Sequence, residues 1–280
     1  TIPMKNNRGE IIGVLQLINA HDQHNKVVPF KDDDEPIVQH FALYAANAIE
    51  RAQMTRMTIM RMISMAELRD PKETGPHVNR VAAYAVEIYE AYAKKKGIAQ
   101  DKIDSHRDAL RLAAMLHDVG KVAISDLILK KPGRFNDEEY ELMKLHTIHG
   151  AFLFNDARSE FDEYSAEVAL NHHERWDGNG YPGHVDINTA KPLKGFAEKN
   201  GKARGKKGEE IPLFGRIVAL ADVYDALSCR RVYKEAWDEE KVINLIKEEC
   251  GKHFDPEIVD VFFDIIDVIH SISQRYPDDH

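Results

Sequence analysis

The spacing of apolar residues divides the chain into a strand-like start, one long helix and a large helical remainder. Residues 11–19 alternate like a strand and follow a turn-forming run at residues 6–9. Between residues 35 and 66 apolar side chains recur every three or four positions, which predicts one amphipathic helix. Since this helix exceeds the ordinary globular length, we expect it to connect domains and to form a parallel coiled-coil homodimer through residues 37–66.

The remainder, residues 67–280, is predicted to be nearly all helical, with Gly and Pro turn signals between the periodic segments. Residues 184–210 are polar and rich in Lys and Gly, so we expect an exposed loop there. Gly120 is predicted to end one helix as a left-handed cap. The predicted helices cover residues 76–96, 104–119, 137–154, 163–175, 212–228, 238–250 and 255–273.

Composition limits the classes of function. The chain has 280 residues, 43 % of them hydrophobic, which is ordinary for a globular protein with one large or two small domains. No apolar run approaches the ~20 residues of a membrane helix. The formal net charge of -9 argues against binding a nucleic-acid polymer. Only Cys229 and Cys250 are present, so we expect no disulfide framework and a cytoplasmic location.

Histidines and aspartates in apolar helical settings are the candidate chemistry. One such histidine is usually a satisfied core residue, but a set of them is costly to bury without a shared partner. Imidazole and carboxylate together suit Fe, Mn, Ni or Zn, and the absence of cysteine from the set argues against a closed structural zinc site. The set comprises His77, His117, Asp118, His146, His172, His173 and Asp222.

Adjacent side chains on a helix point about 100° apart, so His117 and Asp118 cannot share one helix face. The pair can serve one metal only if the ion lies beyond the end of the helix. Taken alone, the pair is equally typical of a capped helix end with two polar residues.

Seven motifs then follow one another along the chain: residues 69–77, 117–121, 129–133, 146–150, 172–183, 221–227 and 253–256. With them, residues 67–280 resemble the HD-GYP domain, the cyclic di-GMP phosphodiesterase branch of the HD hydrolase superfamily. The strand, acidic loop and helix start within residues 1–50 resemble the C-terminal part of a GAF domain. The resemblance implies a mainly α fold: an HD-type helical bundle preceded by a partial α/β GAF segment and the connecting helix of residues 35–66.

The resemblance also implies a metal centre. It places ligands at His77, His117, Asp118, His146, His172, His173 and Asp222, with Asp118 as the bridging carboxylate. Glu73, four residues before His77, matches a glutamate that supports a third metal in some family members. We therefore expect a dinuclear or trinuclear centre of iron, with manganese as the alternative. Asp225, one turn after Asp222, is expected to support the ligands or pack the helix.

The implied reaction is hydrolysis of cyclic di-GMP to pGpG and/or GMP by a hydroxide that bridges the metals, with Asp118 and Lys121 as catalytic residues. Two alternatives stay open: a module that binds the dinucleotide without cleaving it, and a hydrolase of 3′,3′-cyclic GMP-AMP. The implied substrate contacts are Lys121, Gly180, Tyr181, Pro182, Arg231, Tyr233 and Lys234. The sequence departs from the family at residues 183–209, a longer segment than usual that we expect to form a flap beside the site.

Overall fold

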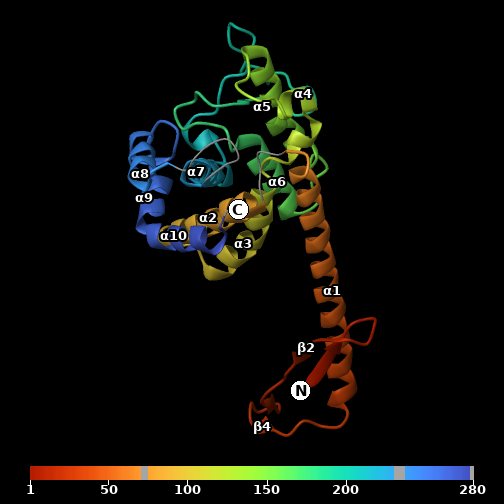
Figure 1. Ribbon diagram of the computed structural model, residues 1–280. Coiled ribbons are helices and arrows are strands. Elements are labelled where there is room, and N and C mark those ends of the chain that lie inside the picture. Colours follow the sequence, from red (N-terminus) through yellow and green to blue (C-terminus); the bar gives the residue numbers. More distant parts are fainter. Residues whose placement is uncertain (71–74, 230–236, 278–280) are drawn as a thin grey trace. The chain divides into compact units, whose positions relative to one another are not determined.

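The computed structural model describes residues 1–70, 75–229 and 237–277 of the protein. The chain divides into two compact units, Thr1–Met62 and Ile63–His280 (Figure 1).

Two small antiparallel sheets form the start of the first unit. Strand β1 (Ile2–Lys5) pairs with β2 (Ile11–Leu15), and β3 (Ala20–His21) pairs with β4 (Val27–Val28). The predicted strand of residues 11–19 is therefore too long. Strand β2 ends at Leu15, and Asn19, with a φ of 58°, has a left-handed conformation that a strand residue does not adopt. The resemblance of residues 1–50 to a GAF domain stays a prediction.

The predicted long helix is confirmed as α1 (Asp34–Glu67), which has 34 residues. Asp34 and Glu35 lie in its first turn, where their negative charge complements the helix dipole. Ile37, Phe41 and Tyr44 expose 57 %, 65 % and 62 % of their surface in the single chain. The predicted homodimer would cover these side chains, and it stays a prediction. Over the described parts of the chain, every helix is too short or too polar to cross a membrane.

The second unit is helical, as predicted, and its loops carry two short 3₁₀ segments, η1 and η2. The loop of residues 184–210 is exposed for most of its length, with isolated bridges between Val185 and Pro192 and between Ala197 and Ala203. The elements are α2 (Gly75–Lys95), α3 (Gln100–Met115), η1 (Val119–Ala123), α4 (Asp126–Leu129), α5 (Asp137–Phe152), α6 (Glu160–Asn171), η2 (Gly208–Glu210), α7 (Leu213–Ser228), α8 (Glu239–Glu248), α9 (Pro256–Asp264) and α10 (Ile266–Arg275).

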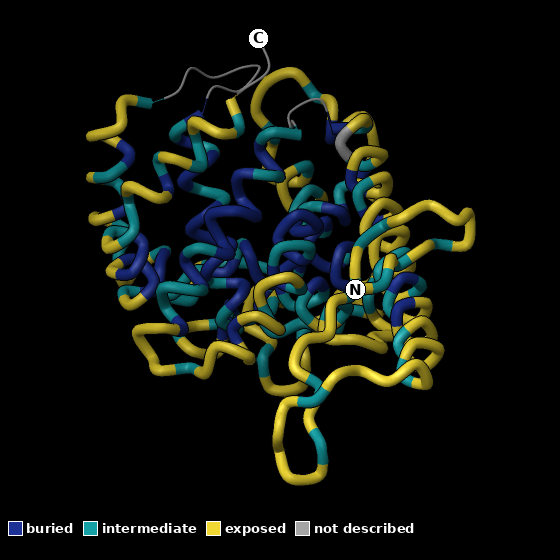
Figure 2. The backbone as a smooth tube through the Cα atoms, turned by 90° about the horizontal axis from the view of Figure 1, so that it is seen from below, coloured by how far each residue is buried: buried dark blue, intermediate teal, exposed yellow. Residues whose placement is uncertain are grey.

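The core of this unit lies where α2, α3, α6 and α7 meet. Helix α2 packs against α3 and α7, while α6 packs against α3, α5 and α7. Tyr84, Ile88, Leu110, Ile217 and Leu220 are completely buried there, and Figure 2 shows the buried positions gathered at the centre of the unit. Each large apolar side chain contributes roughly 1.5–3 kcal/mol when buried. This packing fixes the positions of the helix ends that carry the polar residues.

The second predicted helix ends earlier than expected, and the predicted role of Gly120 is wrong. Helix α3 stops at Met115, so His117 and Asp118 lie in the turn before η1. Gly120 does not adopt the left-handed conformation of a cap. A Cβ at this position would lie 1.9 Å from the carbonyl oxygen of His146, so the glycine instead allows the turn to touch α5.

Two other helix ends also differ from the prediction. Helix α6 ends at Asn171, four residues before the predicted end, which leaves His172 and His173 in the turn that follows. The predicted helix of residues 255–273 is two helices, α9 and α10. They are separated at Ile265, whose φ of -116° and ψ of 20° depart from helical geometry.

Candidate metal centre

Five separate segments bring the candidate ligands together. His77 comes from the first turn of α2, His146 from α5 and Asp222 from α7; the two adjacent pairs come from the turns after α3 and α6. They form two groups, and within each group the ligand atoms lie within 4.8 Å of one another. The Asp118 group contains Asp118, His146, His172 and His173, and the Asp222 group contains Asp222, His77 and His117.

The carboxylate of Asp118 lies between the two groups. Its Oδ1 is 3.1 Å from Nε2 of His146 and 3.5 Å from Nε2 of His172. Its Oδ2 is 3.2 Å from Nε2 of His117, which belongs to the Asp222 group. Since each oxygen faces a different group, the side chain has the geometry that a carboxylate needs to bridge two cations.

The backbone orients three of the histidine rings. Nδ1 lies 2.8 Å from the Ala114 carbonyl in His117, and 2.7 Å from the Met143 carbonyl in His146. In His172 the Nδ1 atom lies 3.1 Å from the carbonyl of Val168. A carbonyl can only accept a hydrogen bond, so Nδ1 carries the proton in each ring. The Nε2 atom is then the one with a lone pair for a metal, and it is the atom that faces Asp118.

A buried carboxylate orients the fourth ring. Asp225 Oδ2 lies 2.7 Å from Nδ1 of His77, and the Asp225 oxygens accept hydrogen bonds from Arg80 Nε at 2.6 Å and Nη2 at 3.0 Å. Burial alone would raise the pKa of Asp225, but His77 and Arg80 outweigh this effect and hold the pKa below its usual range. This arrangement leaves His77 Nε2 3.6 Å from Asp222 Oδ1.

Burial keeps the ligand histidines of the α6 turn neutral. It lowers the pKa of His172, although the hydrogen bond and charge of Asp118 act in the opposite direction. It lowers the pKa of His173 well below the usual value. A neutral imidazole is the form that binds a metal, so these side chains are ready for coordination at neutral pH.

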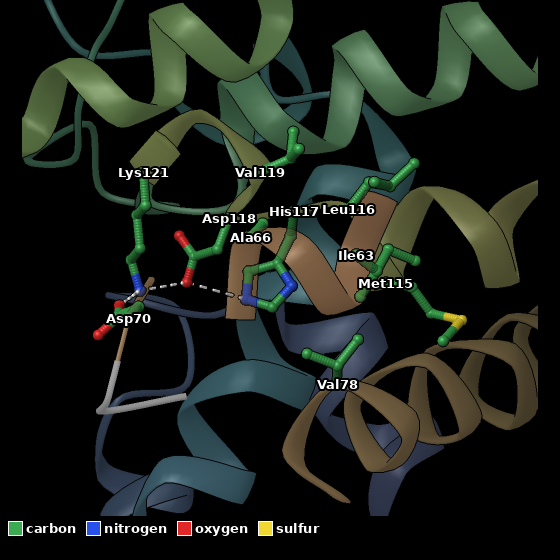
Figure 3. A pocket seen from close by; sticks show the side chains of 10 residues that line it. All are labelled: Ile63, Ala66, Asp70, Val78, Met115, Leu116, His117, Asp118, Val119 and Lys121. Atoms are coloured by element: carbon green, nitrogen blue, oxygen red, sulfur yellow. Dashed lines mark ion pairs between the residues drawn. The ribbon is translucent and has the colours of Figure 1, made fainter. Parts of the chain in front are cut away.

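Lys121 places a positive charge beside the bridging carboxylate. Its Nζ lies 2.7 Å from Asp118 Oδ2 and 3.4 Å from Asp70 Oδ2, and Figure 3 shows these three side chains meeting at one edge of a pocket. The pocket has a cavity volume of about 20 Å³, which is room for a water molecule or an ion. Sequence analysis did not single out Asp70, because only the fold brings the end of α1 to Lys121.

The loop of residues 180–182 packs against the Asp118 group. The Tyr181 ring stacks on His173 with 4.8 Å between centroids, and its backbone N–H donates to the His173 carbonyl at 3.2 Å. Burial raises the pKa of Tyr181, so the phenol stays neutral. A Cβ on Gly180 would lie 2.3 Å from the backbone nitrogen of Arg175, so only glycine permits this close turn.

Two further side chains, Lys144 and Tyr140, belong to the surroundings of the site. Lys144 Nζ lies 4.7 Å from the Tyr140 ring centroid and 5.3 Å from that of Tyr181, both within cation–π range. Sequence reasoning missed these contacts because they depend on how α5 packs against a distant loop. It also missed Arg80, although a charged residue in the largely apolar run of residues 78–89 was a signal for a buried ion pair.

Four of the predicted site residues lie outside the described residues. They are Glu73, predicted as a ligand of a third metal, and Arg231, Tyr233 and Lys234, predicted to contact substrate. Their predicted roles therefore stay predictions.

A helical core that presents imidazole nitrogens and carboxylate oxygens in two adjoining groups defines a helical domain with a candidate site for divalent metals. A family model described as HD domain matches residues 74–227, and a second HD-domain model matches residues 198–258. The chain therefore belongs to the HD domain family, in which such a site binds divalent metal ions.

Curated relatives cover most of this chain. A "Cyclic di-GMP phosphodiesterase" from Vibrio cholerae serotype O1 is 37% identical over 227 residues, 79% of this chain and 42% of that protein. A protein of the same description from Thermotoga maritima is 36% identical over 80% of this chain and 52% of its own length. A "3'3'-cGAMP-specific phosphodiesterase 2" from V. cholerae is 33% identical over 82% of this chain and 38% of its length.

The chain thus spans about half or less of the length of these relatives. Among solved structures, the cyclic GMP-AMP-specific phosphodiesterase V-cGAP3 of V. cholerae aligns over 79% of this chain and 54% of its own. The TM-score is 0.48 and the sequence identity 18%.

Proposed function

We propose that this protein is a metal-dependent phosphodiesterase that hydrolyses cyclic di-GMP to pGpG and/or GMP. The observation that carries the proposal is the position of Asp118, with one oxygen toward each ligand group and Lys121 2.7 Å away. The names of the curated relatives support the reaction class. Hydrolysis of a phosphodiester needs positive charge around the phosphate and an activated water, and this arrangement serves both needs.

The chain's residues would hold two divalent cations, one in each group. Bound cations would lower the pKa of a coordinated water and neutralise charge on the phosphate oxygens. The neutral histidines supply Nε2, and Asp118 ties the two positions together. We propose iron as the metal, with manganese as the alternative, because imidazole and carboxylate ligands suit both. Glu73 is the proposed ligand of a third metal.

Lys121 is proposed to bind the scissile phosphate. Its ammonium is a compact charge on a flexible stem, and it already lies against the bridging carboxylate. Gly180, Tyr181 and Pro182 are proposed to line the substrate path, since the Tyr181 ring covers His173. Arg231, Tyr233 and Lys234 are proposed to face the nucleotide phosphates, since Arg and Lys carry the positive charge that phosphates bind.

The deciding experiment is turnover of cyclic di-GMP by protein purified without oxygen and loaded with Fe²⁺ or Mn²⁺. We expect pGpG or GMP to appear by liquid chromatography, and we expect His117→Ala to remove the activity. Cyclic di-GMP left intact by the loaded protein, with His117→Ala behaving identically, would contradict the proposal. Tight binding without turnover under either metal would instead support a module that only binds the dinucleotide.

A second candidate substrate is 3′,3′-cyclic GMP-AMP, because a relative with 33% identity carries that specificity in its name. Both substrates present the same phosphodiester to the metal centre. They differ in one base, which is guanine in cyclic di-GMP and adenine in cyclic GMP-AMP, so the protein would have to recognise that base. Turnover of the two dinucleotides side by side, compared as kcat/KM, separates the two proposals.

We also propose that the protein acts as a homodimer in the cytoplasm. The dimer would form through residues 37–66, where Ile37, Phe41 and Tyr44 present apolar surface at coiled-coil spacing. Light scattering after gel filtration tests this, and a monomer at micromolar concentration would contradict it. The low cysteine content supports a reducing compartment.

A further inference from the structure

A long loop begins and ends beside the ligand pair His172–His173. We call residues 183–206 the inserted loop. Gly183, where the loop begins, and Gly205, one residue before it ends, are buried, whereas most of the segment between them is exposed. The loop is therefore anchored at its base.

The carboxylate of Glu174 holds both ends of the inserted loop. Glu174 directly follows His173 and is only 2 % exposed. Its Oε1 accepts the backbone N–H of Gly183 at 2.5 Å, and its Oε2 accepts that of Lys206 at 3.1 Å. One buried side chain thus joins the residue where the loop departs to the residue where it returns.

Lys206 reaches the other side of the ligand pair. Its ammonium donates a hydrogen bond to Oδ1 of Asn171, the residue before His172. Asn171 is 2 % exposed, and its amide donates to the Glu167 carbonyl at 2.7 Å, which fixes the side chain on α6. The base of the loop therefore contacts the chain on both sides of His172 and His173.

The backbones at this base touch directly. A Cβ on Gly205 would lie 2.2 Å from the carbonyl oxygen of Gly178, and a Cβ on Gly183 would lie 2.3 Å from that of Arg204. The chain segments at Gly183 and Gly205 therefore cannot shift without moving the turn of residues 174–183, which carries Tyr181 against His173.

From this geometry we propose that Lys206 and Glu174 are positioning residues for the Asp118 group, so that the inserted loop is a structural part of one metal position. The Asp222 group is held differently: α2 and α7 carry His77 and Asp222, Asp225 and Arg80 stand behind His77, and the turn after α3 carries His117. Disturbing the loop base should therefore affect one metal position and spare the other. The inference rests on the proposed metal centre.

The test is metal binding by the full chain with Lys206→Met, which keeps the length of the stem and removes the ammonium. Protein freed of metal is titrated with Mn²⁺ alone, under competition with a chelator, and metal per chain is measured by elemental analysis. We expect one of two binding steps to weaken about 10–100-fold and the other to stay unchanged. Lys206→Arg should restore the weakened step, because it returns a donor to Asn171.

Lys202→Met is the matched control. Lys202 lies in the same loop, but its ammonium pairs with Glu141 at 2.8 Å on the exposed side, so both binding steps should match the wild type. Asn171→Ala removes the same hydrogen bond from the other partner and serves as a second variant, with the thermal midpoint confirming that each variant folds.

The outcomes separate the inference from the proposed function. Two unchanged steps in Lys206→Met, or two steps weakened equally, would overturn the inference alone. A wild-type chain that binds no divalent metal would overturn the proposed function and this inference with it.

Discussion

The two ligand groups of the metal centre are built in different ways. His77 and Asp222 lie within helices α2 and α7, and a buried carboxylate and guanidinium, Asp225 and Arg80, hold the His77 ring. In the Asp118 group, by contrast, Asp118, His172 and His173 lie in turns just beyond helix ends. Two of the three ligands in the Asp222 group therefore depend on helix packing and a charge pair in the core, with only His117 in a turn. Three of the four ligands in the Asp118 group depend on where helices stop and on loops, with only His146 inside a helix.

Each group is therefore sensitive to a different kind of change. A ligand inside a helix is positioned by the packing of that helix, so changes in loops should leave it in place. A ligand in a turn is positioned by hydrogen bonds to its neighbours, such as the contact of His172 with the Val168 carbonyl.

The largest effect is expected for Asp118→Ala. Because its two oxygens face different groups, its loss should weaken both metal positions and lower kcat by on the order of 10³-fold or more. Turnover of cyclic di-GMP and metal content measure this. Asp104→Ala, an exposed carboxylate on α3, is the control and should match the wild type. An Asp118→Ala protein with a full complement of metal would show that the two groups are independent.

Lys121→Met should separate metal binding from chemistry. Its ammonium is proposed to bind the phosphate, so we expect kcat to fall about 10²–10³-fold while both metals stay bound. Single-turnover kinetics with a parallel metal assay checks this. A loss of metal as large as the loss of activity would mean that Lys121 maintains the Asp118 carboxylate instead.

Asp225→Asn should affect the Asp222 group alone. It removes the charge behind His77, so we expect metal affinity at that position to fall about 10–100-fold. It also breaks the buried ion pair between Asp225 and Arg80, which typically costs about 3–5 kcal/mol of stability. Calorimetric titration with Mn²⁺ and urea unfolding measure the two effects.

The double variant Asp225→Asn with Arg80→Met distinguishes these causes. Removing the buried charge should recover part of the free energy of unfolding without restoring the metal affinity. Recovery of both together would mean that Asp225 acts only through stability.

The smallest expected effect is on the pH dependence of stability and comes from His253, which contacts the turn after His173. The His253 carbonyl accepts the Trp176 N–H at 3.0 Å, and burial lowers the pKa of the His253 side chain from 6.5 to about 4. Between these values the unfolded chain binds more protons than the folded one, so stability falls as the pH falls from about 6.5 to 4. The loss attributable to His253 is about 3 kcal/mol.

His253→Gln keeps the backbone contact and removes the titrating group. Urea unfolding at pH 7, 5.5 and 4 should therefore show a shallower loss of stability in the variant than in the wild type. Equal slopes would show that His253 does not carry this pH dependence.

The sequence predicted the helices well where one face is continuously apolar. The periodicity of residues 37–66 predicted α1, and the apolar run around Asp222 predicted α7 to within one residue at its start. The sequence did not predict the ends of those helices that tertiary contacts terminate. Helix α3 stops at Met115 and α6 at Asn171. The turn between His117 and Lys121 is set by the contact of Gly120 with α5, which no local sequence pattern reveals.

The helical class of this protein and its ligand candidates can be predicted from the sequence alone, because apolar periodicity and motif spacing are local properties of the chain. The division of those candidates into two groups, the histidine that each oxygen of Asp118 faces, and the residues behind the ligands depend on tertiary packing. Asp225 and Arg80 lie on separate helices, and Glu174 and Lys206 lie 32 residues apart in the sequence; each pair meets only when the core packs. Distances between residues remote in sequence follow from that packing, and no periodicity encodes them.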